Sequence, residues 1–237
     1  MYQVSLMTRE SPPWSGQRDA PSAAQSPPLV LPPLVLVVDD DAAVRSSIEE
    51  LMLSVGIDAI GFGSTHELLE TEIPDRPGCL VLDVRMPGLS GLDLQQHLAA
   101  TGDAKPIIFL TGYGDIPMSV QAMKAGAVDF LTKPFRDQSL LDAVTMGIEQ
   151  DRAQRIDAGL VRQQTDHYAT LTARERQVLR LVTLGRLNKQ IAFDLGITEV
   201  TVKLHRSSVM KKMQASSIGE LIRAWEMLPA DLRERTT

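Results

Sequence analysis

Five short apolar runs alternate along this chain with segments whose apolar residues recur at helical spacing. Strands that are apolar along their whole length are typical of a parallel sheet buried on both faces. Parallel strands need a crossover, usually a helix, between one strand and the next. The pattern therefore predicts an α/β fold built on a five-stranded parallel, doubly wound sheet. The expected strands are Leu34–Val38, Ile57–Phe62, Cys79–Asp83, Ile107–Leu110 and Val128–Thr132.

A helix is expected after each strand. The first is expected over Ala42–Ser54, and Ser64-Thr65-His66-Glu67 has the sequence of a capping box that opens the second. Further helices are expected over Leu92–Ala100, over 117–125 and from about Asp137 onward.

Acidic residues stand where two of the expected strands end. Asp39, Asp40 and Asp41 follow the first strand, and Asp83 ends the third. Ligands of open α/β sheets bind outside the carboxyl ends of the strands, so these side chains are expected to share one crevice. Crowded carboxylates repel one another unless a hard cation neutralises them. The sequence therefore predicts a Mg²⁺ (or Mn²⁺) site, whereas Asp41 is expected to be a helix N-cap.

Two further strand ends supply complementary groups. Thr111 follows the fourth strand and Lys133 the fifth, so both are expected to face the same crevice. A hydroxyl can donate to a phosphoryl oxygen and an ammonium can neutralise one. A cis Lys133–Pro134 bond would aim the lysine inward, and Phe130 is expected near Thr111.

Charge divides the chain into two parts. The net charge is −6, but residues 34–150 hold 7 Lys and Arg against 18 Asp and Glu, whereas residues 151–237 hold 15 against 10. This asymmetry predicts an acidic domain joined to a basic one, and the basic part is the candidate for binding nucleic acid.

The 237 residues suffice for two domains. Residues 1–33 are rich in proline and are expected to be a disordered tail, or an upstream stretch from a misplaced start codon. Residues 151–166 are expected to form a helical linker or a dimer contact, between a domain at 34–150 and one at 167–237.

No apolar run is long enough to span a membrane, and no signal peptide is visible. The single cysteine, Cys79, suits a reducing cytosol, so a cytoplasmic protein is expected.

The domain at 167–237 is expected to be all-helical. Thr172-Ala173-Arg174-Glu175 is a second capping box, Asn188 is expected to cap a short helix, and Gly196 to make a tight turn. A basic helix is expected from Glu199 to about Met213, and a last amphipathic helix from Ser217 to about Leu228. On the basic helix, one stripe is expected to pack inward and the opposite one to be exposed. The inward stripe is Val202, His205, Val209 and Met213, and the exposed one is Glu199, Lys203, Arg206, Ser207 and Met210.

The first domain resembles the receiver domain of two-component response regulators, a flavodoxin-like fold. The motifs are VVDDD at 37–41, LDVRMPG at 82–88, TGYGD at 111–115 and DFLTKPF at 129–135. The resemblance implies that Asp83 accepts a phosphoryl group from a histidine kinase and that Lys133 is its phosphate partner. Asp40 would bind Mg²⁺ directly, Asp39 largely through water, and the carbonyl of Arg85 would complete the ligands. Thr111 and Phe130 would be the switch pair.

Two residues near the phosphoacceptor are expected to set the lifetime of the phosphoryl group. Arg85 follows Asp83 by two residues and Tyr113 follows Thr111 by two, so both side chains can lie over the site. A bulky tyrosine there would screen attacking water.

The last domain resembles the LuxR-type helix-turn-helix output domain of the NarL/FixJ class, expected as a small four-helix unit. The motifs are LTARERQVLRLV at 171–182, NKQIAFDLGI at 188–197 and TVKLHRSSVMKKM at 201–213. The resemblance implies base contacts by Lys203, Leu204 and Ser207. Thr201, Arg206, Lys211 and Lys189 are expected to contact phosphates, which supply affinity without sequence information. Ser207 departs from the class, whose members often place a longer side chain there, so the base preference is not transferred.

Taken together, the sequence predicts a phosphorylation-dependent transcription regulator rather than an enzyme acting on other molecules. Its expected partners are a cognate sensor histidine kinase, promoter DNA, a second copy of the chain after phosphorylation, and RNA polymerase; no membrane partner is expected. The alternative is a phosphorylated interaction module or phosphate sink that binds no specific DNA. A classical enzyme lacks support, because the sequence has no P-loop or zinc spacing and its four histidines are scattered.

Overall fold

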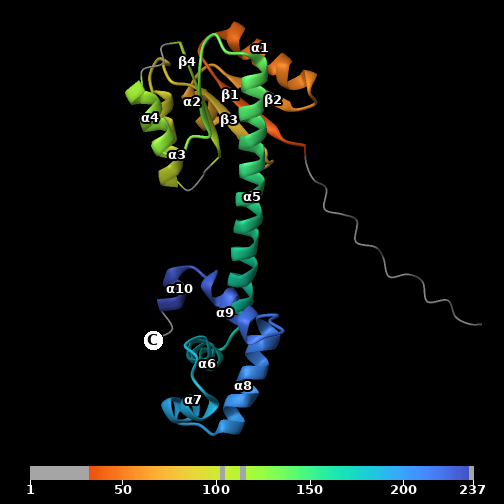
Figure 1. Ribbon diagram of the computed structural model, residues 1–237, viewed down its shortest axis with the longest axis vertical. Helices are drawn as coiled ribbons and strands as arrows, with labels where there is room; N and C mark the ends of the chain where they lie inside the picture. The colour runs from red at the N-terminus through yellow and green to blue at the C-terminus, as the bar shows by residue number, and fades with distance from the viewer. Residues whose placement is uncertain (1–31, 102–104, 113–115, 235–237) are drawn as a thin grey trace, which may run out of the picture. The chain divides into compact units, whose positions relative to one another are not determined.

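The computed structural model describes residues 32–101, 105–112 and 116–234 (Figure 1). The predicted tail therefore lies outside the described residues, apart from Pro32 and Pro33. Two regions with separate hydrophobic cores are present: an α/β domain, and a helical domain that follows it in the chain.

The α/β domain is built on a five-stranded parallel sheet in the order β2-β1-β3-β4-β5. This confirms the predicted fold class, and each observed boundary lies within one residue of the predicted one. Strands β1 and β3 are buried along their whole length because helices cover both faces of the sheet. The strands are β1 (Leu34–Val38), β2 (Asp58–Phe62), β3 (Gly78–Asp83), β4 (Ile107–Thr111) and β5 (Asp129–Thr132).

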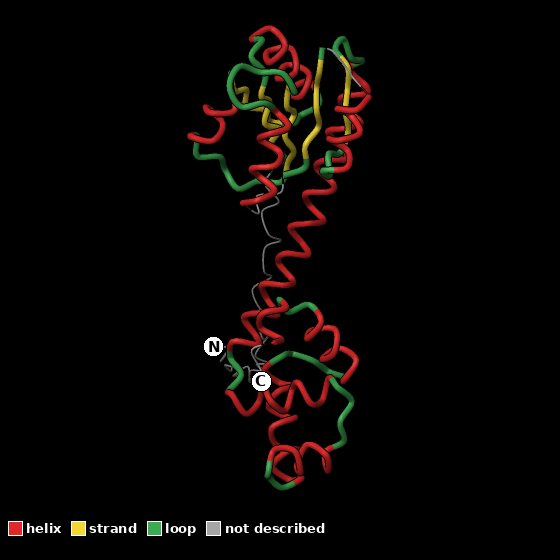
Figure 2. Tube along the Cα trace, turned by 90° about the vertical axis from the view of Figure 1, so that its left-hand side faces the viewer, coloured by secondary structure: helices red, strands yellow, loops and turns green. Residues whose placement is uncertain are grey.

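Helices cover the sheet in two layers, and Figure 2 shows the strands between them. Helices α2 (Thr65–Glu70), α3 (Gly91–Thr101) and α4 (Ile116–Lys124) pack on one face, against residues such as Leu36, Leu80 and Phe109. Helix α1 (Ala42–Ser54) and the first part of α5 (Asp137–Ala169) pack on the other, against Val35, Val81 and Ile108. Alternate residues of each central strand thus contribute to separate cores, as the two-residue period of a strand requires.

The helix starts follow the predicted capping chemistry with one difference. The carboxylate of Asp41 accepts a hydrogen bond from the N–H of Ala43, so Asp41 caps α1 as expected. The hydroxyl of Ser64 accepts from the N–H of Glu67. The carboxylate of Glu67, however, accepts from the N–H of Gly63 rather than from Ser64, so the box reaches one residue further back.

Helix α5 is continuous over Asp137–Ala169 and includes the stretch that was expected to be a linker. The start of that stretch is attached to the α/β domain. The buried carboxylate of Asp151 accepts from the N–H of Gly78 at 2.8 Å and from Nε of Arg155 at 2.8 Å. Arg155 also bonds to Asp75 and to the carbonyl of Arg76. The first turn of the expected linker therefore packs as part of the α/β domain.

The helical domain contains α6 (Ala173–Thr183), α7 (Asn188–Leu195), α8 (Glu199–Lys212), α9 (Ile218–Glu226) and a short α10 (Ala230–Glu234). Its core includes Val178, Leu179, Ile191 and Val202. Helix α10 was not predicted. The last predicted helix reached about Leu228, but Pro229, which follows it, is a favourable residue at the start of a new helix.

Three details of this domain compare with the predictions as follows. The capping box at Thr172 and Glu175 is present. Asn188 is not the cap of α7 but its first residue; the N–H of the preceding Leu187 instead donates to the side chain of Gln190. Gly196 ends α7 with a φ of 64°, a left-handed conformation that glycine adopts without strain.

None of the helices in the described part of the chain combines the length and the hydrophobicity needed to cross a bilayer.

Candidate functional site

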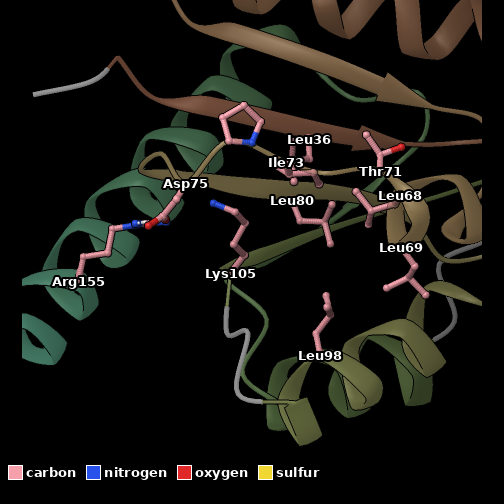
Figure 3. A pocket seen from close by; sticks show the side chains of 11 residues that line it. Leu36, Leu68, Leu69, Thr71, Ile73, Asp75, Leu80, Leu98, Lys105 and Arg155 are labelled. Carbon is pink, nitrogen blue, oxygen red and sulfur yellow. Dashed lines mark hydrogen bonds and ion pairs between the residues drawn. The ribbon is translucent and has the colours of Figure 1, made fainter. Parts of the chain in front are cut away.

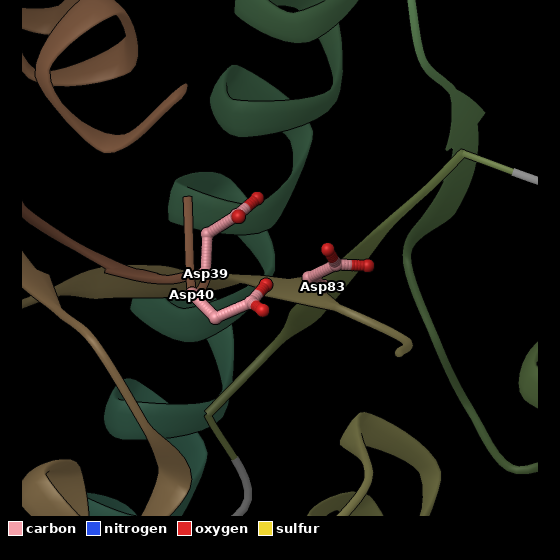
Figure 4. Close-up of side chains that lie close together, drawn as sticks. All are labelled: Asp39, Asp40 and Asp83. Carbon is pink, nitrogen blue, oxygen red and sulfur yellow. The ribbon is translucent and has the colours of Figure 1, made fainter. Parts of the chain in front are cut away.

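Three carboxylates meet at the carboxyl edge of the sheet (Figure 4). Asp39 and Asp40 follow β1, and Asp83 is the last residue of β3, the neighbouring strand. Each residue offers one carboxylate oxygen that lies within 4.8 Å of the others. Asp39 and Asp83 are buried and Asp40 is exposed, so the cluster is open on one side only. The structure thus brings together the acidic residues that the sequence placed at strand ends.

Lys133 joins two of these carboxylates. Its Nζ donates to Oδ2 of Asp39 at 2.5 Å and to Oδ2 of Asp83 at 2.9 Å, and the Lys133–Pro134 bond is cis. Burial alone would lower the pKa of Lys133, but the two carboxylates outweigh it and raise the pKa, so the ammonium remains protonated. Burial raises the pKa of Asp39, against the opposing effect of Lys133.

The cluster carries more negative than positive charge. One ammonium faces three carboxylates, and no hydrogen bond or ion pair to another described residue engages the carboxylate of Asp40. A second cationic side chain, Arg45, donates a hydrogen bond from Nη1 to the main-chain carbonyl of Asp39. Carboxylate oxygens are ligands that Mg²⁺ accepts. The donor chemistry and the uncompensated charge therefore fit a divalent cation between Asp39, Asp40 and Asp83.

The backbone around the cluster fixes two of its side chains. The N–H of Asp41 donates to Asp39, and the N–H of Arg85 donates to Asp83 at 3.1 Å. The loop after β3 passes close to the start of α3. A Cβ at Gly91 would lie 2.4 Å from the carbonyl oxygen of Asp83, so only glycine fits there. Neither the Arg45 contact nor the Gly91 contact was predicted, because neither follows from the local sequence pattern.

The remaining predicted residues of this domain are placed as follows. Thr111 is fully buried at the end of β4. Phe130 is half-buried in β5, where it pairs in register with Phe109, and the two ring centroids are 6.3 Å apart. Thr111 pairs with Thr132, two residues further along β5. The side chain of Arg85 is exposed, and Tyr113 lies outside the described residues.

A second candidate site is the outer surface of α8. The side chains of Lys203, Leu204, Ser207 and Lys211 are exposed, and Leu204 is 65% exposed although it is apolar. On the inward stripe Val202, Val209 and Met213 are buried. The helix thus presents polar and apolar side chains outward, on a width that fits a DNA major groove.

Some residues of α8 differ from the prediction. Arg206 is half-buried because its Nη1 donates to Oδ1 of Asn188 on α7, at 2.9 Å, and Met210 is half-buried against the core. His205 is half-buried rather than part of the core. The hydroxyl of Thr201 lies 2.9 Å from that of Thr198, which caps the helix, and Lys189 is exposed on α7.

A cavity of about 400 Å³ lies apart from both sites (Figure 3). Leu36 and Leu80 line it from the sheet and Leu98 lines it from α3, whereas Lys105 and Arg155 lie at one end (Figure 3). It shares no residue with the acidic cluster.

Comparison with known proteins identifies both domains. Residues 35–145 match the response regulator receiver domain, and residues 169–225 match the bacterial regulatory proteins of the luxR family. A doubly wound domain with an acidic cluster, joined to a helix-turn-helix domain, is the architecture of a response regulator that acts on transcription.

Related proteins share this architecture over most of the chain. Nodulation protein W of Bradyrhizobium diazoefficiens is 53% identical, over 82% of this chain and 86% of that protein. Response regulator protein TodT of Pseudomonas putida is 46% identical, over 84% and 88%. Transcriptional regulatory protein FixJ of Azorhizobium caulinodans is 43% identical, over 80% and 90%. The low-resolution structure of response regulator StyR is 46% identical and covers 83% of this chain and 99% of that chain, with a TM-score of 0.73. The chain therefore belongs to the two-component response regulators of the NarL/FixJ class, with a LuxR-type DNA-binding domain.

Proposed function

We propose that Asp83 is the phosphoacceptor of this response regulator and that its phosphorylation promotes dimerisation and promoter binding. The observation that carries the proposal is the cluster of three carboxylates bridged by one ammonium at the carboxyl edge of the sheet. Asp83 is the member at the centre of the sheet edge, on the strand between β1 and β4.

The chemistry follows from the side chains present. An oxygen of Asp83 attacks the phosphorus of a phosphohistidine on the kinase, the P–N bond breaks and the imidazole takes up a proton. Mg²⁺ held by Asp39, Asp40, Asp83 and the carbonyl of Arg85 would neutralise charge on the phosphoryl oxygens. Lys133 exchanges its hydrogen bond to Asp83 for one to a phosphoryl oxygen, and Thr111 donates its hydroxyl to another. Arg85 and Tyr113 limit the access of water and so set the phosphoryl lifetime.

The switch proceeds from this site to the surface. When Thr111 moves toward the phosphoryl group, it vacates space into which Phe130 rotates, and the surface of α4 and β5 (roughly 117–132) changes. That surface then favours a receiver dimer, because the phosphorylated state is the one with the matching contacts.

Dimerisation places two copies of α8 on paired half-sites of a promoter, about one helical turn of DNA apart. Lys203, Leu204 and Ser207 contact base edges, and Thr201, Arg206, Lys211 and Lys189 contact phosphates. Arg206 is already oriented by Asn188, which reduces the ordering cost of such a contact. RNA polymerase is the further partner that transcriptional control requires. The protein acts in the cytoplasm, with residues 34–150 as receiver, 151–166 as linker and 167–237 as DNA-binding domain.

The proposal is tested with the full chain, a small phosphodonor and Mg²⁺. Wild type and Asp83→Asn are compared by sedimentation and by gel retardation of the DNA upstream of the protein's own coding region. The donor is expected to increase both dimer mass and retardation in wild type only. A donor-dependent dimer that retards no DNA more than unrelated sequence does would favour a phosphate sink instead.

A further inference from the structure

The second half of α5 carries an apolar stripe on the face opposite to the one packed on the receiver. Successive residues of a helix are rotated by about 100°. On this basis the stripe of Ala153, Ile156 and Leu160 is centred about 180° from the buried face. The residues of α5 that are buried in the receiver are Leu140, Ala143, Val144, Gly147, Ile148 and Asp151.

This stripe has no partner among the described residues. Ile156 is 64% exposed, Leu160 is 40% exposed and Ala153 is exposed, and none of them belongs to the hydrophobic clusters of the described chain. Helices in proteins gain most of their stability by packing an apolar face. The spacing of three and then four residues is that of the a and d positions of a coiled coil.

The charged side chains on either side of the stripe favour a parallel copy of the same helix as the partner. Arg152 and Asp157 flank it on opposite sides, and no ion pair joins either of them to another described side chain. They are five residues apart, the separation of a g position and the e position that it meets on a parallel partner helix. In a parallel pair of identical helices, Arg152 of each copy therefore meets Asp157 of the other. An antiparallel pair would place like charges together.

We propose that residues 153–160 of α5 form a self-association face that docks on the same segment of a second copy, as a short parallel coiled coil. The proposal rests on the proposed phosphorylation-dependent dimer. Two polar residues bound the stripe, since Glu149 and Gln163 occupy the d positions before and after it. Such a short stripe does not hold two monomers together alone. It contributes once the phosphorylated receivers raise the effective concentration of one helix around the other.

Cysteine cross-linking tests the face directly. The native Cys79 is fully buried, so an introduced cysteine is the accessible one. The variants are Ile156→Cys, on the stripe, and Ala158→Cys, which is also exposed but lies on the far side of the helix. With phosphodonor, Mg²⁺ and mild oxidation, Ile156→Cys is expected to yield at least about tenfold more cross-linked dimer than Ala158→Cys. Without the donor, both variants are expected to remain monomeric.

Charge reversal tests the register. Arg152→Asp and Asp157→Arg are each expected to weaken the phosphorylated dimer by about 3- to 10-fold, because two symmetric pairs are lost. The double variant restores both pairs and is expected to return the dimerisation constant to that of wild type, measured by sedimentation.

The outcomes separate this inference from the proposed function. A phosphorylated dimer in which Ile156→Cys and Ala158→Cys cross-link alike, or which the double reversal fails to restore, overturns the coiled coil and leaves the proposed function intact. A phosphorylated protein that remains monomeric overturns both.

Discussion

At the scale of single residues, the acidic cluster combines one buried ion pair with one uncompensated carboxylate. Asp39 and Asp83 share Lys133, whereas Asp40 is exposed and has no partner among the described residues. Like charges held this close repel each other and destabilise the fold unless a cation is bound. Asp40 is therefore the residue at which binding and stability are expected to oppose each other.

Replacement of Asp40 by Asn is expected to raise the free energy of unfolding without Mg²⁺ by about 0.5–1 kcal/mol, since a repulsion is removed. The stabilisation that millimolar Mg²⁺ gives to wild type, through its binding to the folded state, should largely disappear. Chemical denaturation with and without Mg²⁺ measures both effects. Glu50→Gln, at an exposed acidic position away from the cluster, is the control and should leave the Mg²⁺ response unchanged. An undiminished response in Asp40→Asn would show that Asp40 is not a ligand.

A buried carboxylate in the helical domain gives a pH-dependent prediction. Burial opposes ionisation of Glu175, but Lys212, 2.7 Å away, and Thr172 outweigh it and lower the pKa of Glu175 below 4.5. A depressed pKa contributes stability that is present above the pKa of the unfolded chain and is lost as the pH falls through the folded-state pKa.

Replacement of Glu175 by Gln is therefore expected to lower the free energy of unfolding by about 1 kcal/mol at pH 7. The difference from wild type should shrink as the pH falls below 4.5, the ordinary pKa of the residue. Fluorescence of Trp225, which packs beside Tyr168 in the helical core, reports unfolding of this domain in a Trp14→Phe background. A difference that stays constant down to pH 3 would contradict the ion pair with Lys212.

At the scale of elements, the DNA contacts predicted for α7 and α8 are of two kinds. A lysine that bonds to base edges contributes to one sequence, whereas a lysine that contacts phosphate contributes to all sequences and to the salt dependence. Lys203 on α8 and Lys189 on α7 are both exposed, so replacing either of them by alanine removes one positive charge from the surface.

Lys203→Ala is expected to cost about 1–3 kcal/mol on a site selected from random DNA, with little effect on non-specific DNA. Lys189→Ala is expected to weaken binding to both kinds of DNA alike and to lower the salt slope by about 1. Fluorescence anisotropy with the two DNAs at several salt concentrations distinguishes these patterns. If both variants weaken the two DNAs equally, Lys203 is not a base contact.

Much of the element structure could be predicted, because the local pattern carries it. The apolar runs determined the strands, and residues such as Asp41, Ser64 and Thr172 marked helix starts through their own side chains. The strand ends also predicted which carboxylates meet, since parallel strands share a carboxyl edge.

What could not be predicted depends on residues far apart in the sequence. Asp151 was expected to begin the linker, yet it is buried and its carboxylate accepts from the N–H of Gly78, 73 residues away. Arg206 was expected to be exposed, but it donates to the side chain of Asn188 on the neighbouring helix. A helical wheel shows which face a residue lies on, but it does not show the helix that will cover that face.

At the scale of the whole molecule, the proposed mechanism links one acyl phosphate to a dimer on DNA. In the proposed mechanism, neither the receiver nor the DNA-binding domain needs to change its fold, because the phosphoryl group shifts the population between two receiver states. The free energy that can shift this equilibrium is limited to the difference in the interaction free energy of the phosphoryl group with the two states. If the mechanism holds as proposed, every later step, from the α4–β5 surface to the paired half-sites, depends on modification of one side chain.

The most direct test of the central claim is mass spectrometry of the peptide that contains Asp83, after treatment of the full chain with a small phosphodonor and Mg²⁺. We expect an adduct of about 80 Da, the mass of a phosphoryl group, on that peptide. The adduct should be absent from the corresponding peptide of Asp83→Asn and from wild type treated with chelator. A wild-type peptide without the adduct, or an adduct that persists in Asp83→Asn, would contradict the assignment of Asp83 as phosphoacceptor.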